Sequence, residues 1–211
     1  MEISNFKELI KNLPYKNHSF DVKKSNWNNK LPERFKNIIF NENETVTISR
    51  QDLFFEAEEN LELFIIKTLM WGYPTGGRGN HIKSLLSEDE KNFEQLVGCL
   101  RGWRKKNIDL NCMKDLIEKI KGLGLSTITK FTQFLSTTIN GNRAIILDDQ
   151  IISAINSSRF KDFENLSSIN YDNAIKNYDE YIQIVSKISD KIKADPDQIE
   201  MFLFVFGKNL K

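Results

Sequence analysis

A glycine turn and a downstream aspartate are the residues of this chain whose types and spacing could support chemistry. Residues 122–124 read Gly-Leu-Gly and separate two segments with helical periodicity, and Asp148 stands later, at the predicted start of another helix. Glycine has no Cβ, so such a turn lets the backbone approach an anion while the N–H groups of the next helix point toward it. A carboxylate nearby can stabilise positive charge or deprotonate a nucleophile. The alternatives are a generic corner between two helices and a simple helix cap.

A second glycine-rich stretch, residues 70–81, reads MWGYPTGGRGNH. It places four of the ten glycines of the chain within eight positions, beside large aromatic and basic side chains. Such a loop costs conformational entropy and is typical of a surface that approaches a partner, although a plain helix–helix loop held by a buried Trp71 fits as well. A nucleotide-binding P-loop is excluded, because Gly77 is followed by Arg78 rather than by a lysine and a hydroxyl residue.

Length and composition indicate a globular protein. The chain has 211 residues, of which 40% are hydrophobic, which is enough for a core. No apolar run approaches the roughly 20 residues that cross a bilayer, and the N-terminus lacks the apolar segment of a signal peptide, so we expect a cytoplasmic protein with no membrane partner. The two cysteines, Cys99 and Cys112, are too few for a disulfide framework or a structural metal site, and we expect no metal and no cofactor.

The net charge of +1 hides an uneven distribution along the chain. Residues 101–143 hold nine Lys and Arg against three acidic residues, whereas residues 51–100 hold four against nine. The basic segment fits a surface that binds a polyanion, and it fits a solvated helix face equally well.

Helical periodicity dominates the chain and predicts an all-α fold. A brief alternation at residues 45–48 favours a short strand, residues 143–147 read as extended, and Ser49 with Asp52 resembles a helix-starting capping box. The helices are expected at about 3–13, 33–40, 50–71, 80–86, 88–102, 113–121, 126–135, 149–156, 171–192 and 196–206.

The glycine turn and the aspartate together resemble the helix-hairpin-helix DNA glycosylase superfamily, which includes endonuclease III, the adenine glycosylases and the 8-oxoguanine glycosylases. Residues 122–127, GLGLST, match the hairpin pattern of that superfamily, and residues 146–148, ILD, match its catalytic aspartate motif. The chain departs from the pattern at Ile128, where the family usually has alanine. Ser126 and Asp148 are 22 positions apart, slightly more than is usual.

The resemblance implies a two-lobed helical helix-hairpin-helix DNA glycosylase fold. It covers about residues 50–157 by motif, which would form the catalytic lobe, while residues 1–49 and 158–211 would complete a second lobe. It looks closest to compact bacterial proteins of the 8-oxoguanine-glycosylase fold without the N-terminal β-domain. The implied activity is excision of a damaged or modified base that is flipped out of DNA, by a monomer that contacts the DNA backbone without reading sequence.

The resemblance also assigns roles to residues near the hairpin. Asp148 would be the catalytic carboxylate, with Asp149 as its rival. Bifunctional members carry a nucleophilic lysine at the position of Ser126, so the serine implies a monofunctional enzyme that uses water. A relocated lysine, Lys121 or Lys130, is the alternative, although both also suit phosphate contacts.

In the superfamily a polar loop lies beside the extruded base, and this position of the loop implies the remaining site residues. Trp71 and Tyr73 are the candidates for the base pocket or for a wedge, with Trp103 as a further stacking candidate, and each could equally be core. The expected DNA-binding residues are Lys121, Gly122, Leu123, Gly124, Thr127, Lys130, Arg78, Asn80 and His81.

Two other classes of function fit the same features. A non-catalytic DNA-binding module would keep the hairpin without turnover, and a helical protein-interaction domain would carry the motif by coincidence. Within the glycosylase class, the resemblance suggests oxidised guanine as the excised base. A hypermodified base in foreign DNA, removed in defence, is also compatible with the large glycine loop.

Overall fold

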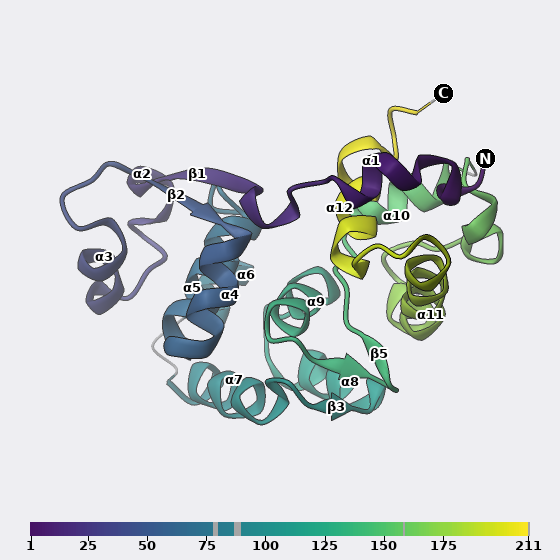
Figure 1. The fold of residues 1–211 in the computed structure, drawn as a ribbon. Coiled ribbons are helices and arrows are strands. Elements are labelled where there is room, and N and C mark those ends of the chain that lie inside the picture. Colours follow the sequence, from purple (N-terminus) through teal and green to yellow (C-terminus); the bar gives the residue numbers. More distant parts are fainter. Residues whose placement is uncertain (78–79, 87–89, 158, 211) are drawn as a thin grey trace.

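The structure is a computed structural model that describes residues 1–77, 80–86, 90–157 and 159–210. Its fold is mainly helical with two small sheets (Figure 1). The expectation of a helical fold is thus confirmed in part, because helices dominate and short paired strands add two small sheets.

The first sheet joins two segments from the N-terminal quarter of the chain. Strand β1 (Ser19–Lys23) pairs antiparallel with β2 (Thr45–Ser49), with Ser19 opposite Ser49. Only the second strand was predicted. The connection contains α2 (Lys24–Trp27) and α3 (Glu33–Phe40). Trp27 and Phe40 are fully buried there, so this polar stretch still contributes to the core.

The predicted helix over residues 50–71 is in fact two helices, α4 (Arg50–Glu59) and α5 (Leu61–Gly72). The expected capping box of Ser49 and Asp52 starts α4, as predicted. Asn60 breaks the run because its backbone is extended and its Oδ1 accepts a hydrogen bond from Leu63 N at 3.1 Å, which caps α5.

The helical hairpin lies at the centre of the molecule. The chain continues through α6 (His81–Leu85), α7 (Glu90–Trp103), α8 (Leu110–Lys119) and α9 (Leu125–Phe134). The predicted turn between two helices is present between α8 and α9. Helix α9 is almost entirely buried, with α4, α5, α7 and α8 packed around it.

The second sheet ties the ends of this hairpin together. Strand β3 (Asn107–Ile108) runs parallel to β4 (Thr138–Ile139), and β4 pairs antiparallel with β5 (Asn142–Arg143). Each strand has two residues, too few for an alternation that sequence can reveal.

The remaining helices gather beside α12 (Pro196–Phe206), which contacts α1 (Lys7–Lys11), α10 (Asp149–Asn156) and α11 (Ala174–Ile192). Both termini lie at this end (Figure 1). Short 3₁₀ helices connect the group: η1 (Ile3–Phe6), η2 (Tyr15–Asn17) and η3 (Lys161–Leu166). The β1–β2 sheet packs instead on α5. The division into lobes at residues 49/50 and 157/158 stays a prediction. None of the described helices combines the length and apolarity needed to span a membrane.

Candidate active site

The two glycine-rich stretches of the sequence meet in space. Gly122 has φ +90°, and a Cβ at this position would lie 2.4 Å from the carbonyl oxygen of His81. His81 begins α6 directly after the glycine-rich loop. The hairpin glycine is thus required both by its backbone conformation and by the close approach of another backbone.

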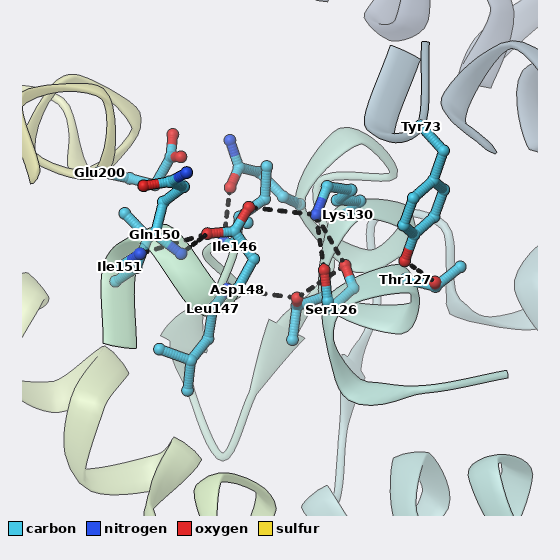
Figure 2. A network of polar contacts seen from close by, with 12 residues as sticks. Tyr73, Ser126, Thr127, Lys130, Ile146, Leu147, Asp148, Gln150, Ile151 and Glu200 are labelled. Carbon is cyan, nitrogen blue, oxygen red and sulfur yellow. Dashed lines mark hydrogen bonds and ion pairs between the residues drawn. The ribbon is translucent and has the colours of Figure 1, made fainter. Parts of the chain in front are cut away.

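Two tyrosines reach the N-terminus of α9. The Tyr73 hydroxyl lies 2.9 Å from the Thr127 hydroxyl (Figure 2). The Tyr171 hydroxyl hydrogen-bonds the backbone of Ser126, and burial raises the pKa of this phenol. The sequence predicted a helix that begins at Tyr171. Because α11 begins only at Ala174, the ring is instead half exposed beside Gly124.

Asp148 caps α10 and has one oxygen left for another partner. Its Oδ1 accepts hydrogen bonds from Gln150 N at 3.1 Å and Ile151 N at 3.2 Å. Its Oδ2 lies 3.3 Å from the Nζ atom of Lys130 (Figure 2). The side chain is 15% exposed, so this carboxylate is not sealed within the interior.

The extended segment before Asp148 is held from both sides. Helix α9 supplies Gln133, whose Oε1 accepts from Ile146 N at 2.6 Å, and Thr129, whose Oγ1 accepts from Leu147 N at 3.2 Å. From α11, the Tyr181 hydroxyl donates to Ile146 O at 3.0 Å. These bonds satisfy buried backbone groups and fix the position of the carboxylate.

Lys130 is inside the site rather than on the surface. Its Nζ atom donates to the Ser126 hydroxyl at 2.8 Å and to the Ser126 carbonyl at 3.1 Å, in addition to its contact with Asp148. The side chain is only 5% exposed. Gly72, at the end of α5, leaves room for the aliphatic part: a Cβ there would lie 3.1 Å from Cδ of Lys130.

The other residues expected at the site differ in accessibility. Lys121, Asn80, His81 and Asp149 are exposed. Leu123 and Thr127 are buried, each with 5% of its surface accessible. Arg78 lies outside the described residues.

Trp71 does not offer a free ring face to a base. It is 2% exposed and packs edge-on against His18, Phe20 and Phe134, with ring centroids 5.5 to 5.6 Å apart. Trp71 therefore belongs to the core. Tyr73 and Trp103 are partly exposed.

Several residues around Trp71 were missed by the sequence analysis. The guanidinium of Arg50 lies 5.2 Å from the Trp71 ring and forms a buried ion pair with Glu200. Burial, and secondarily the charge of Arg50, lowers the pKa of His18 to about 4, so this imidazole is neutral at pH 7. Nothing in sequence periodicity links these positions, because they come from three distant segments.

A cavity of about 640 Å³ lies at the opposite end of α9 from the hairpin. It is lined by Tyr15, Lys16, Gln51, Phe54, Ser136, Arg143, Asp195 and Asp197. Asp148 and Lys130 do not line it, so this cavity and the candidate chemistry are separate features.

A helical hairpin beside a carboxylate at a helix N-terminus is the arrangement that characterises helix-hairpin-helix glycosylases, and the family comparison agrees. Residues 14–204 match the family model described as "Putative 8-oxoguanine DNA glycosylase OGG-like protein". The chain belongs to this family, which confirms the resemblance and implies the helix-hairpin-helix glycosylase fold with DNA as substrate. No curated protein and no solved structure gives a significant match.

Proposed function

We propose that this protein removes a damaged or modified base from DNA, with Asp148 as the catalytic carboxylate. The observation that carries the proposal is the position of Asp148: it caps α10, faces Lys130 of α9 and keeps part of its surface open to solvent. Asp149, its rival in the sequence, is exposed, and no described contact ties its carboxylate to the hairpin. Membership of the glycosylase family supports the reaction class.

Cleavage of an N-glycosidic bond requires a carboxylate in such a position. Breaking an N-glycosidic bond builds positive charge on the deoxyribose, as glycoside hydrolysis does through its oxocarbenium-like transition state. A carboxylate beside C1′ stabilises that charge and orients or deprotonates the attacking group. In the simplest form of the proposal that group is water, as predicted from Ser126.

DNA binding would use the edge that the two glycine-rich stretches form together. His81 and Gly122 are in close contact, so the start of α6 and the hairpin can follow one strand. Asn80 and Lys121 are exposed next to this contact. Gly124 belongs to the same proposed surface, and Arg78, which lies outside the described residues, stays a predicted DNA contact. Backbone contacts of this kind position a duplex without reading its sequence, and the enzyme would act as a monomer.

The base is proposed to be an oxidised guanine, on the strength of the family description. A hypermodified base in foreign DNA is the alternative substrate of the same site. Tyr73, partly exposed and bonded to Thr127, is the proposed wedge or stacking residue.

The test is mass spectrometry of the bases released from duplex and single-stranded DNAs that carry a panel of modified bases. Asp148→Asn should reduce release by roughly 10²- to 10⁴-fold, the usual worth of a general base. Asp149→Asn is the matched control and should keep the wild-type rate. Both variants retain a capping side chain, so folding is preserved. Release by neither the native chain nor the control, together with salt-sensitive DNA binding, would favour the non-catalytic DNA-binding module.

A further inference from the structure

Lys130 brings an amine to the place where the hairpin sequence lacks one. It follows Ser126 by four positions, and residues four apart lie on the same face of a helix. Its side chain runs back along α9 to the Ser126 hydroxyl, 2.8 Å from Nζ (Figure 2). The amine thus lies beside the side chain of Ser126 and within 3.3 Å of Asp148 Oδ2.

Stability alone does not account for a lysine in this place. A buried ion pair gains little net free energy, because desolvation of both charges opposes their attraction. Asp148 already accepts two backbone hydrogen bonds through its other oxygen. The ammonium bonds the backbone of its own helix only through the Ser126 carbonyl, which lies at the first turn. A leucine or methionine beside Gly72 would fill the same space without a charge to desolvate.

The carboxylate is the more accessible member of the pair. Lys130 is 5% exposed and Asp148 is 15% exposed, so both are mostly buried and Asp148 keeps some contact with solvent. A sugar placed against Asp148 would be within reach of a side chain that has four rotatable methylenes. The methylene groups of Lys130 pack beside Gly72, so its terminal amine is the part of the side chain that is left to move.

We infer that Lys130 is the nucleophile of this enzyme, an amine displaced by one helical turn from the position that Ser126 occupies. The inference rests on the proposed function, in which the Lys130 amine now takes the place of water as the attacking group. The product would be a covalent imine between Nζ and C1′ of the deoxyribose, and strand cleavage would follow base release.

The steps balance with the groups at the site. Lys130 gives one ammonium proton to Asp148, and the neutral amine forms the Nζ–C1′ bond as the C1′–N bond to the base breaks. The departing base keeps the electron pair and takes a second proton from nitrogen. The nitrogen lone pair then forms C1′=N⁺, the C1′–O4′ bond breaks, and O4′ takes the proton held by Asp148. The Asp148 carboxylate, free again, would then take a proton from C2′; the C2′=C3′ double bond forms, the C3′–O bond breaks, and the 3′ phosphate leaves, which cuts the strand.

Borohydride trapping tests the inference on the intact protein. The probe is a duplex with a single abasic site, so that the identity of the excised base does not matter. Hydride reduces an imine to a stable amine, and peptide mass spectrometry of the native adduct should find the deoxyribose on Lys130. A mapped adduct on any other lysine, or no adduct, would overturn the inference.

Matched variants separate this result from a folding defect. Lys130→Gln should lose trapping, while Lys187→Gln, at an exposed lysine of α11 outside the proposed DNA-binding surface, should trap like the native chain. The double variant Ser126→Lys with Lys130→Ser should regain trapping, because it moves the amine one turn back along the same face.

Should Lys130→Gln release a base as fast as the native chain, the proposed function stands and Lys130 is not the nucleophile. Trapping at Lys130 without release of any base from the panel would instead contradict the proposed glycosylase function. The assignment of Lys130 as the nucleophilic amine would still stand.

Discussion

Arg50 and Glu200 stand 150 positions apart and form a buried bidentate ion pair that joins α4 to α12. Arg50 Nη1 lies 2.5 Å from Glu200 Oε2, and Nη2 lies 3.1 Å from Oε1. Both side chains have no accessible surface. The pair thus fixes the start of α4 against the last helix, and the Arg50 guanidinium lies 5.2 Å from the Trp71 ring.

Breaking this ion pair should destabilise the fold strongly. Glu200→Gln leaves the guanidinium buried without a counter-charge and should cost about 3–5 kcal/mol of unfolding free energy, measured by urea denaturation. The matched control is Glu62→Gln in the exposed pair of Arg34 and Glu62, which should change stability by less than about 1 kcal/mol. Equal effects of the two variants would show that the buried pair has no special role.

Stability should fall between acidic and neutral pH because of Asp197. Burial raises the pKa of this carboxyl to about 7, partly offset by Arg143. The folded protein therefore holds a proton that the unfolded chain releases near pH 3.8. The resulting stabilisation is fully present below about pH 4 and is lost as the pH rises toward 7, by at most about 4 kcal/mol.

Asp197→Asn removes this titration and keeps the oxygen that accepts from Gln133 Nε2. The variant should lose less stability than the native chain between pH 4.5 and 7.5 in urea denaturation. Asp109→Asn, which keeps the exposed cap of α8, should retain the native profile. A native-like profile for Asp197→Asn would contradict the raised pKa.

The sequence predicted those features whose causes are local. The capping box at Ser49, the start of a helix at Pro196, the turn at Gly122 and the cap at Asp148 each depend on residues within a few positions. Helix periodicity likewise located most of the helices. The break at Asn60 was missed because the apolar pattern continues across it and only the side-chain cap ends it.

Features that depend on long-range contacts were not predictable. Strand β1 forms because β2 pairs with it, and the Arg50–Glu200 pair joins opposite ends of the chain. Lys130 shares a helix face with Ser126, which the sequence does reveal. Its approach to Asp148 depends on the path of the chain through β4 and β5, which short strands do not reveal.

Gly122 should tolerate alanine less well than Gly141. Both have positive φ, +90° and +85°, so each substitution costs about 1–2 kcal/mol of backbone strain. A Cβ at Gly122 would also meet the His81 carbonyl, whereas nothing lies within 4 Å at Gly141. Urea denaturation should show the larger loss for Gly122→Ala, and hydrogen exchange should quicken in residues 80–86. Equal losses would mean that the hairpin and α6 separate at little cost.

Two threonines test whether the backbone before Asp148 must be held. Thr129 Oγ1 accepts from Leu147 N at 3.2 Å, so Thr129→Val leaves a buried N–H without a partner and should cost about 1–3 kcal/mol. Thr68 Oγ1 is buried with no hydrogen-bond partner in the described part of the chain, so Thr68→Val should be neutral or stabilising by about 1 kcal/mol. Urea denaturation should therefore show a loss of unfolding free energy for Thr129→Val and no loss, or a gain, for Thr68→Val.

Base release extends this comparison to function. Thr129→Val should lower kcat with little change in KM, because the freed Leu147 backbone lets Asp148 drift from the sugar, whereas Thr68→Val should leave both constants unchanged. A loss of stability in Thr129→Val without a fall in kcat would mean that the Tyr181 and Gln133 contacts with Ile146 hold the carboxylate without help from Thr129.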